Sequence, residues 1–492
     1  MADQASPADD AVSDFDPYAM PKSAIQDPPK TLWEALRKIG PGIILAGTIV
    51  GSGELLLTTA MGARFGYVFM WLILFSCVIK VFVQIELGRY AISSGKPTLG
   101  AINGLPGPRF GAHLLVWWWL FMMMGTIFQL GAMTGTVGQS LNLAFPSISA
   151  NIGNSFQGVW EPLGGSVLDR PEYPWAILTC VIALILMWRG GYKRVEIVTT
   201  VLVVLVTLVT VTAAIALQWT DHPIRWGEVL QGLWVTAPPS GVAEAFAVFG
   251  ITGVGASELF YYPYWCLEKG YARYAGPRDD SPEWAARAKG WIHVMYLDAW
   301  ISMVVFTLAT VAFYFMGATV LHPLGKHPKG KEMILELSHM YVGPFGEWTS
   351  IFFLVGAGTV LFKTLYASSA GNGRLLTDFL SLAKFVRIQS HEQRATISRW
   401  LCLLFPIIAL SLFLFFKEPK AMAVAGACGQ AATLPMISAA AIYFRYKGTD
   451  KRISPSIAWD LCLWTAFLLI TIVALYALGN EVVKVVNPPP AT

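Results

Sequence analysis

Two apolar stretches of the sequence are each interrupted at a glycine and then followed by a glutamate. Residues 50–55 read Val-Gly-Ser-Gly-Glu-Leu, and residues 254–259 read Val-Gly-Ala-Ser-Glu-Leu. In a membrane, a carboxylate beside a helix break is tolerated only where it faces a packed or water-filled interior. A matched pair of glycine-interrupted spans points to the binding site of a transporter. We therefore expect a membrane carrier whose solute site lies at the bilayer midplane, between the two breaks.

The composition indicates an integral membrane protein. Of 492 residues, 55% are hydrophobic and 13% are charged, a balance far from that of soluble domains. The net charge of +4 is scattered over loops, so we expect no nucleic-acid partner. The six cysteines stand singly and show no metal-ligand spacing, which favours packing roles. No nucleophile-base pair or phosphate-binding loop is visible, so neither an enzyme nor a cofactor is expected.

The hydropathy pattern predicts an all-α protein with eleven membrane-spanning helices. An acidic, proline-rich segment at 1–31 is expected to be a disordered cytosolic tail. A first repeat of five spans covers 32–219, a second covers 242–446, and the eleventh span lies at 457–480. The expected spans are 42–61, 68–91, 113–143, 174–188, 195–219, 242–267, 291–321, 345–375, 400–416, 421–446 and 457–478.

The distribution of basic residues predicts the orientation. With the amino terminus in the cytosol, the inner segments hold twenty-three Lys and Arg residues and the outer segments hold nine. Because positive charge accumulates on the cytosolic side, this arrangement is favoured. The carboxyl terminus is then extracytoplasmic, and the chain is expected in the plasma (inner) membrane. The interrupted spans 1 and 6 run in opposite directions, as in an inverted repeat with discontinuous helices.

Several landmarks, in their order and spacing, resemble the Nramp (natural resistance-associated macrophage protein) family of divalent metal transporters over about residues 40–478. They are Gly40-Pro41-Gly42 before span 1, Arg89 with Ser94-Gly95-Lys96 after span 2, Tyr192–Glu196 at span 5, Asp298, Ala367–Gly371 and Leu434-Pro435. The resemblance implies a LeuT-type fold with five-plus-five inverted repeats. It also implies inward transport of divalent metal cations, usually with protons.

The chain departs from the family where the metal binds. The family's span 1 carries Asp-Pro-Gly-Asn, and here Gly51 takes the place of the Asp and Glu54 that of the Asn. The family's Met ligand in span 6 aligns with Gly255, and an Ala whose carbonyl is a ligand aligns with Thr252. Span 3 has none of the carboxylates that carry protons in coupled members. The chain is thus similar to a divergent branch that lost the Met and handles magnesium, and we expect weak or no proton coupling.

The resulting candidate metal ligands are Gly51, Glu54, Thr252, Gly255 and Glu258. An ionised carboxylate near the midplane costs at least about 2.5–3.5 kcal/mol, more than a helix dipole returns. Each glutamate therefore requires a bound cation, a proton, or a basic partner such as Lys80 or Lys363. Two further candidates each have a second interpretation: Gln430 could supply an amide oxygen or only pack, and Asp298 could join a proton path or tether a neighbouring helix.

The leading hypothesis is a secondary transporter of divalent cations, with Mg²⁺ or Mn²⁺ as the transported substrate. Glycine and serine at the breaks leave oxygen ligands and room for water, which suits hard cations better than Cd²⁺ or Fe²⁺. Two alternatives stay open: a cation-coupled carrier of an organic, amino-acid-like solute on the same fold, and a non-transporting membrane sensor. The other expected partner is the lipid bilayer, and a monomer is plausible.

Overall fold

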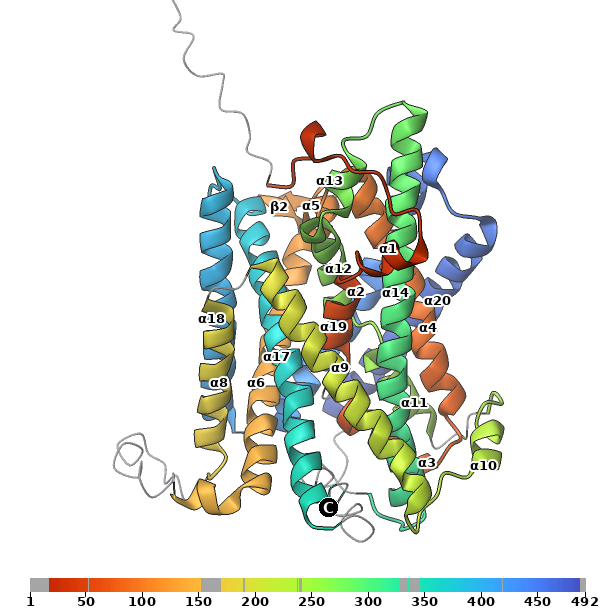
Figure 1. Cartoon of the computed structure of the whole chain (residues 1–492), viewed down its shortest axis with the longest axis vertical. Helices are drawn as coiled ribbons and strands as arrows, with labels where there is room; N and C mark the ends of the chain where they lie inside the picture. The colour runs from red at the N-terminus through yellow and green to blue at the C-terminus, as the bar shows by residue number, and fades with distance from the viewer. Residues whose placement is uncertain are drawn as a thin grey trace, which may run out of the picture.

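The computed structural model describes residues 17–51, 53–151, 170–188, 191–236, 238, 241–327, 335–336, 338, 346–417 and 419–486. Within these ranges the chain is a bundle of long helices that run between two ends of the molecule (Figure 1). A single two-stranded antiparallel pair, β1 (Arg109–Phe110) and β2 (Ala112–His113), lies at one end. The expected all-α architecture is therefore observed.

Eight helices in the described residues are long and apolar enough to cross a membrane. Local signals set some of their ends: Ser281 and Ser390 cap helix starts, and Gly95, in the left-handed conformation, ends α4. The eight are α4 (Met70–Ser94), α6 (Leu114–Ala144), α9 (Tyr192–Ala216, continued by η4, Leu217–Trp219), α14 (Pro282–Met316, continued by η6, Gly317–Leu321), α17 (Trp348–Leu382), α18 (His391–Phe416), α19 (Pro419–Tyr443) and α20 (Ile457–Val486).

Both interrupted spans are broken helices. α2 (Pro41–Ile49) is followed by a π-helical turn, η2 (Gly53–Thr58), and by α3 (Thr59–Phe65), and the two halves are bent by more than 40°. α11 (Val242–Ile251) stops before α12 (Ala256–Lys269) begins. Gly253 between them has φ +70°, a conformation that favours glycine. If these two pairs and the shorter α8 (Tyr173–Trp188) each cross the membrane, the expected eleven spans result; that count remains a prediction.

Short elements gather mainly at one end of the bundle. They are η1 (Lys22–Ala24), α1 (Leu32–Leu36), α5 (Thr98–Asn103), α13 (Tyr271–Ala275), η7 (Phe444–Gly448) and η8 (Lys451–Ile453), whereas α10 (Trp226–Gln231) lies towards the opposite end (Figure 1). Two contacts join loop segments that the distribution of basic residues places on the same side of the membrane: Arg278 pairs with Asp450, and Arg452 donates to the carbonyl of Ser281. That this end faces the cytosol stays a prediction.

The amino-terminal segment is ordered where the structure describes it. The Tyr18 hydroxyl donates to Asp378 at 2.8 Å, and the Arg394 guanidinium lies 4.6 Å from the centre of the Tyr18 ring. The amide of Gln26 donates to the carbonyl of Tyr274. The expected disorder of the tail is therefore wrong for residues 17–31, because aromatic and hydrogen-bonding side chains tie this segment to the bundle. Residues 1–16 lie outside the described residues.

Two glycines let α3 and the end of α14 approach until their backbones touch. A Cβ added at Gly317 would lie 2.0 Å from the carbonyl oxygen of Thr59, and one at Gly62 would lie 2.4 Å from that of Tyr314. Small residues allow such close helix packing in membranes, where dispersion contacts replace the hydrophobic effect. This contact fixes the half-helix that follows the first break.

We expect Gly317→Ala to lower the free energy of unfolding by about 1–3 kcal/mol, because the added methyl group meets rigid backbone. A thermal melt of the purified protein in detergent measures the effect. Gly479→Ala is the matched control, since a Cβ there meets nothing within 4 Å, and it should leave the melting temperature unchanged. Equal melting of the two variants would contradict the backbone contact.

Candidate cation-binding site

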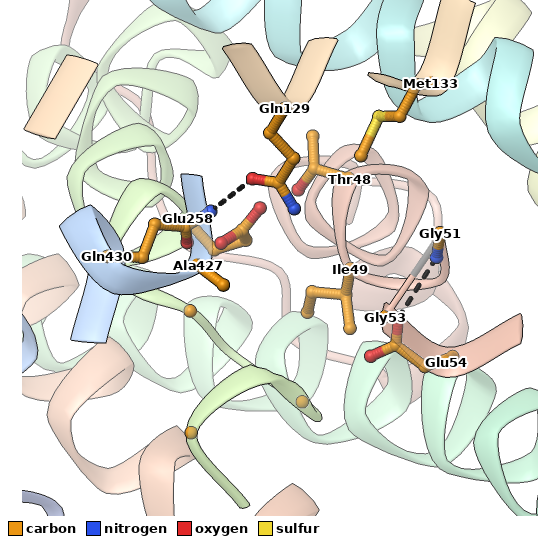
Figure 2. A pocket seen from close by; sticks show the side chains of 13 residues that line it. Thr48, Ile49, Gly51, Gly53, Glu54, Gln129, Met133, Glu258, Ala427 and Gln430 are labelled. Carbon is orange, nitrogen blue, oxygen red and sulfur yellow. Dashed lines mark hydrogen bonds between the residues drawn. The ribbon is translucent and has the colours of Figure 1, made fainter. Parts of the chain in front are cut away.

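The two breaks open onto one small cavity of about 40 Å³ between α2, α6, α12 and α19 (Figure 2). Since a water-sized particle needs roughly 10–15 Å³ of such space, the cavity holds about three. Four of the five expected ligands and Gln430 line it. The full lining is Thr48, Ile49, Gly51, Gly53, Glu54, Gln129, Met133, Gly250, Gly253, Gly255, Glu258, Ala427 and Gln430.

Oxygen atoms converge beside Gly255. Oε2 of Glu258 and Oε1 of Gln430 lie 2.6 and 2.7 Å from the point that a Cβ of Gly255 would occupy. The Gln430 amide in turn donates to Oε1 of Gln129 on α6 at 2.7 Å. Three helices thus supply a carboxylate and two amides, and the absence of a side chain at Gly255 leaves room for them.

Glu54 approaches the cavity from another side. It is 1% exposed, and its Oε2 accepts a hydrogen bond from the backbone amide of Gly51 at 3.1 Å. Its Oε1 is buried and has no hydrogen-bond partner among the described residues. Figure 2 shows Ile49 between Glu54 and Glu258. A buried carboxylate oxygen without a partner carries a desolvation cost that a bound cation would remove.

Thr252 and Asp298 lie outside this cavity. The Thr252 carbonyl accepts hydrogen bonds from Lys80 and Ser76, so it is directed away from the expected ligand set. The Asp298 carboxylate accepts the amides of Gly40 and Gly42 at 2.8 and 2.6 Å. Asp298 therefore holds the start of α2, which matches the tether that was its second interpretation.

Sequence reasoning missed Gln129, Thr48 and Met133. Gln129 carries a weak signal, because it is one of three amides in the uncharged core of span 3, with Gln139 and Asn142. The signal for Met133 is weaker, since methionine fills apolar spans for packing reasons. Its presence corrects the expectation of a site built from oxygen alone: a thioether borders the cavity.

Other polar residues in the spans have separate roles. Glu86 and Arg89 form a buried ion pair, 3.0 Å apart. Neither Lys80 nor Lys363 forms an ion pair with a glutamate in the described part of the chain; both instead donate to backbone carbonyls. Across the described ranges, no group of three or more His, Cys, Asp or Glu residues is placed to hold a metal ion. A cation here would need amide, carbonyl and water oxygens besides the carboxylates.

Comparisons with known proteins bear on the family and the fold. The sequence model of the family "Natural resistance-associated macrophage protein-like" (Nramp) matches residues 42–480. A search of curated protein sequences found no match.

Among solved structures, the Eremococcus coleocola manganese transporter, in complex with an aromatic bis-isothiourea substituted compound, is similar with a TM-score of 0.64 and 13% identity. That likeness covers 96% of this chain and 92% of that chain. Mhp1, a nucleobase-cation-symport-1 family transporter in a closed conformation with bromovinylhydantoin bound, is similar with a TM-score of 0.50 and 15% identity, over 92% and 94% of the two chains. These likenesses confirm the expected LeuT-type membrane fold.

Proposed function

The chain belongs to the Nramp family, and from that premise we propose that it carries a divalent metal cation across the membrane by alternating access. Members of this family are transporters and not enzymes. The observation that carries the proposal is that two buried glutamates, Glu54 and Glu258, one from each broken helix, line the same cavity. The two half-bundles would rock around this fixed site.

The donor atoms support a hard cation. Glu258, Gln430 and Gln129 supply carboxylate and amide oxygens, which Mg²⁺ and Mn²⁺ accept together with retained water. The Met133 thioether is one weak soft donor beside several oxygens. We therefore propose Mg²⁺ or Mn²⁺ as the substrate and leave the choice between them open. The cation is cargo in this proposal, and no resident cofactor takes part.

The size of the cavity supports an ion over an organic solute. An engineered apolar cavity that binds benzene measures about 150 Å³, whereas this one is about 40 Å³. An amino-acid carboxylate would also meet Glu54 and Glu258 at the starts of the half-helices that would otherwise attract it. No observation favours a sensor. We further propose that the protein is a monomer and that its amino terminus is cytosolic in the inner membrane.

We expect proteoliposomes containing the protein to take up Mg²⁺ or Mn²⁺ at least about tenfold faster than Cd²⁺ at equal concentration, because oxygen donors dominate the site. Uptake of each ion measured with an entrapped indicator checks this. Met133→Leu is the informative companion, since it removes the thioether at nearly constant volume. Fast Cd²⁺ uptake that disappears in Met133→Leu would contradict hard-cation selectivity and would identify the sulfur as a ligand.

A further inference from the structure

A buried lysine meets the carbonyl end of the half-helix before the first break. Lys363 on α17 is 1% exposed, and its ammonium group donates to the carbonyls of Gly47 and Val50 at 3.0 and 2.5 Å. The hydroxyl of Thr364 lies 3.2 and 3.1 Å from the same two oxygens. The two carbonyls where α2 stops thus accept from an ammonium group and from a hydroxyl of the neighbouring residue.

The second break repeats this arrangement with different residues. Lys80 on α4 is fully buried and donates to the carbonyls of Phe249 and Thr252 at 2.5 and 2.7 Å. The Ser76 hydroxyl lies 3.1 and 3.2 Å from those oxygens. As at the first break, the two carbonyls are three residues apart, and a hydroxyl from the same helix as the lysine accompanies it.

These carbonyl pairs have the character of cation sites. The end of a half-helix carries the negative pole of the helix dipole, and unwound carbonyls at such ends coordinate Na⁺ in transporters built from broken helices. Within the described residues, no carboxylate lies within ion-pair distance of either lysine. The partial negative charge of the carbonyl oxygens is therefore what compensates each ammonium group.

We propose that the two breaks contain monovalent cation sites that the chain fills permanently with its own lysines, so that transport needs no monovalent co-ion. Lys363 and Lys80 then neutralise the carbonyl ends in both the loaded and the empty carrier. The statement about transport rests on the proposed function, whereas the statement about ion sites does not.

The test removes the internal cation and asks whether a free one replaces it. Purified wild type and Lys363→Ser are melted in NaCl, KCl and choline chloride at equal ionic strength. The serine variant opens the site, so Na⁺ or K⁺ should raise its melting temperature by at least about 2 °C over choline. Wild type should melt alike in all three salts. Lys363→Met is the matched control, because its side chain fills the space without charge, and it should show no salt-specific shift.

Equal melting of Lys363→Ser in the three salts would overturn the proposal. If that variant is recovered in none of the salts, the pair Lys80→Ser and Lys80→Met decides by the same measurement. In proteoliposomes, divalent uptake should be unchanged when choline replaces Na⁺ for wild type, but should require Na⁺ or K⁺ for Lys363→Ser. Because melting does not depend on divalent transport, a wild type that carries no metal would refute the proposed function and leave the ion-site result standing.

Discussion

Divalent-cation uptake should fall at least about 100-fold in Glu258→Gln, because loss of even an outer partner of a metal commonly costs about 10–100-fold in affinity. The substitution keeps the shape of a side chain that is 8% exposed and removes its charge. The oxygen cluster beside Gly255 would then consist of three amides, too little to offset the dehydration of a doubly charged ion. We expect Glu54→Gln to lose uptake as well, since Glu54 also lines the cavity and its buried Oε1 has no hydrogen-bond partner among the described residues.

A matched control separates the site from the general effect of losing a carboxylate. Glu244 lies on α11 of the same broken span, but it is part of an exposed ion pair with Arg64 at 2.7 Å. An exposed pair is worth about 0–1 kcal/mol, so Glu244→Gln should keep uptake within about twofold. If Glu258→Gln takes up the cation as fast as wild type in liposomes of equal protein content, Glu258 is not part of the site.

Gly255→Ala should also lower uptake about 100-fold or more while leaving the protein folded. The backbone at Gly255 is extended, with φ −84° and ψ 178°, so alanine causes no strain there. Its methyl carbon, however, would lie 2.6 and 2.7 Å from the oxygens of Glu258 and Gln430. Both side chains end in flexible groups that can move aside at small cost in stability. The cost appears instead in cation binding, which depends on the position of those oxygens.

The control for this variant lies in the same span. A Cβ at Gly250 meets nothing within 4 Å, although the residue borders the cavity. Gly250→Ala should transport within about threefold of wild type and, since it replaces glycine in a helix, should be more stable by up to about 1 kcal/mol. Calorimetric titration of Mn²⁺ into both variants separates binding from transport. Unchanged Mn²⁺ affinity in Gly255→Ala would show that the oxygen cluster is not the binding site.

Features that follow from local pattern were predictable. Stretches of apolar residues as long as a bilayer is thick must form helices, because lipid offers no hydrogen bonds to the backbone. Glycines followed by glutamates inside such stretches marked both breaks, and Gly51, Glu54, Gly255 and Glu258 all line the cavity. The basic turns also indicated which segments gather at one end of the bundle.

Helix ends away from the bilayer were less predictable. α14 begins at Pro282 and α18 at His391, whereas the apolar pattern alone placed these starts at residues 291 and 400. Polar turns extend the amino-terminal ends of both helices beyond the apolar core, and a capping serine precedes the first residue of each helix. Hydropathy does not predict such turns. Outside the bilayer, water can form hydrogen bonds with the backbone, so a polar segment is free to form either a helix or a loop.

By itself the sequence determined the membrane setting, the two breaks and the carboxylates beside them, since each is a property of neighbouring residues along the chain. Only the tertiary structure decided what those breaks contact. It brought Gln129 and Met133 from α6 to the cavity, directed Thr252 to Lys80 and Asp298 to the start of α2, and set Lys363 on the carbonyls of Gly47 and Val50. Which face of a helix meets which neighbour depends on packing between segments far apart in sequence, and an almost uniformly apolar span carries little periodicity to reveal that face.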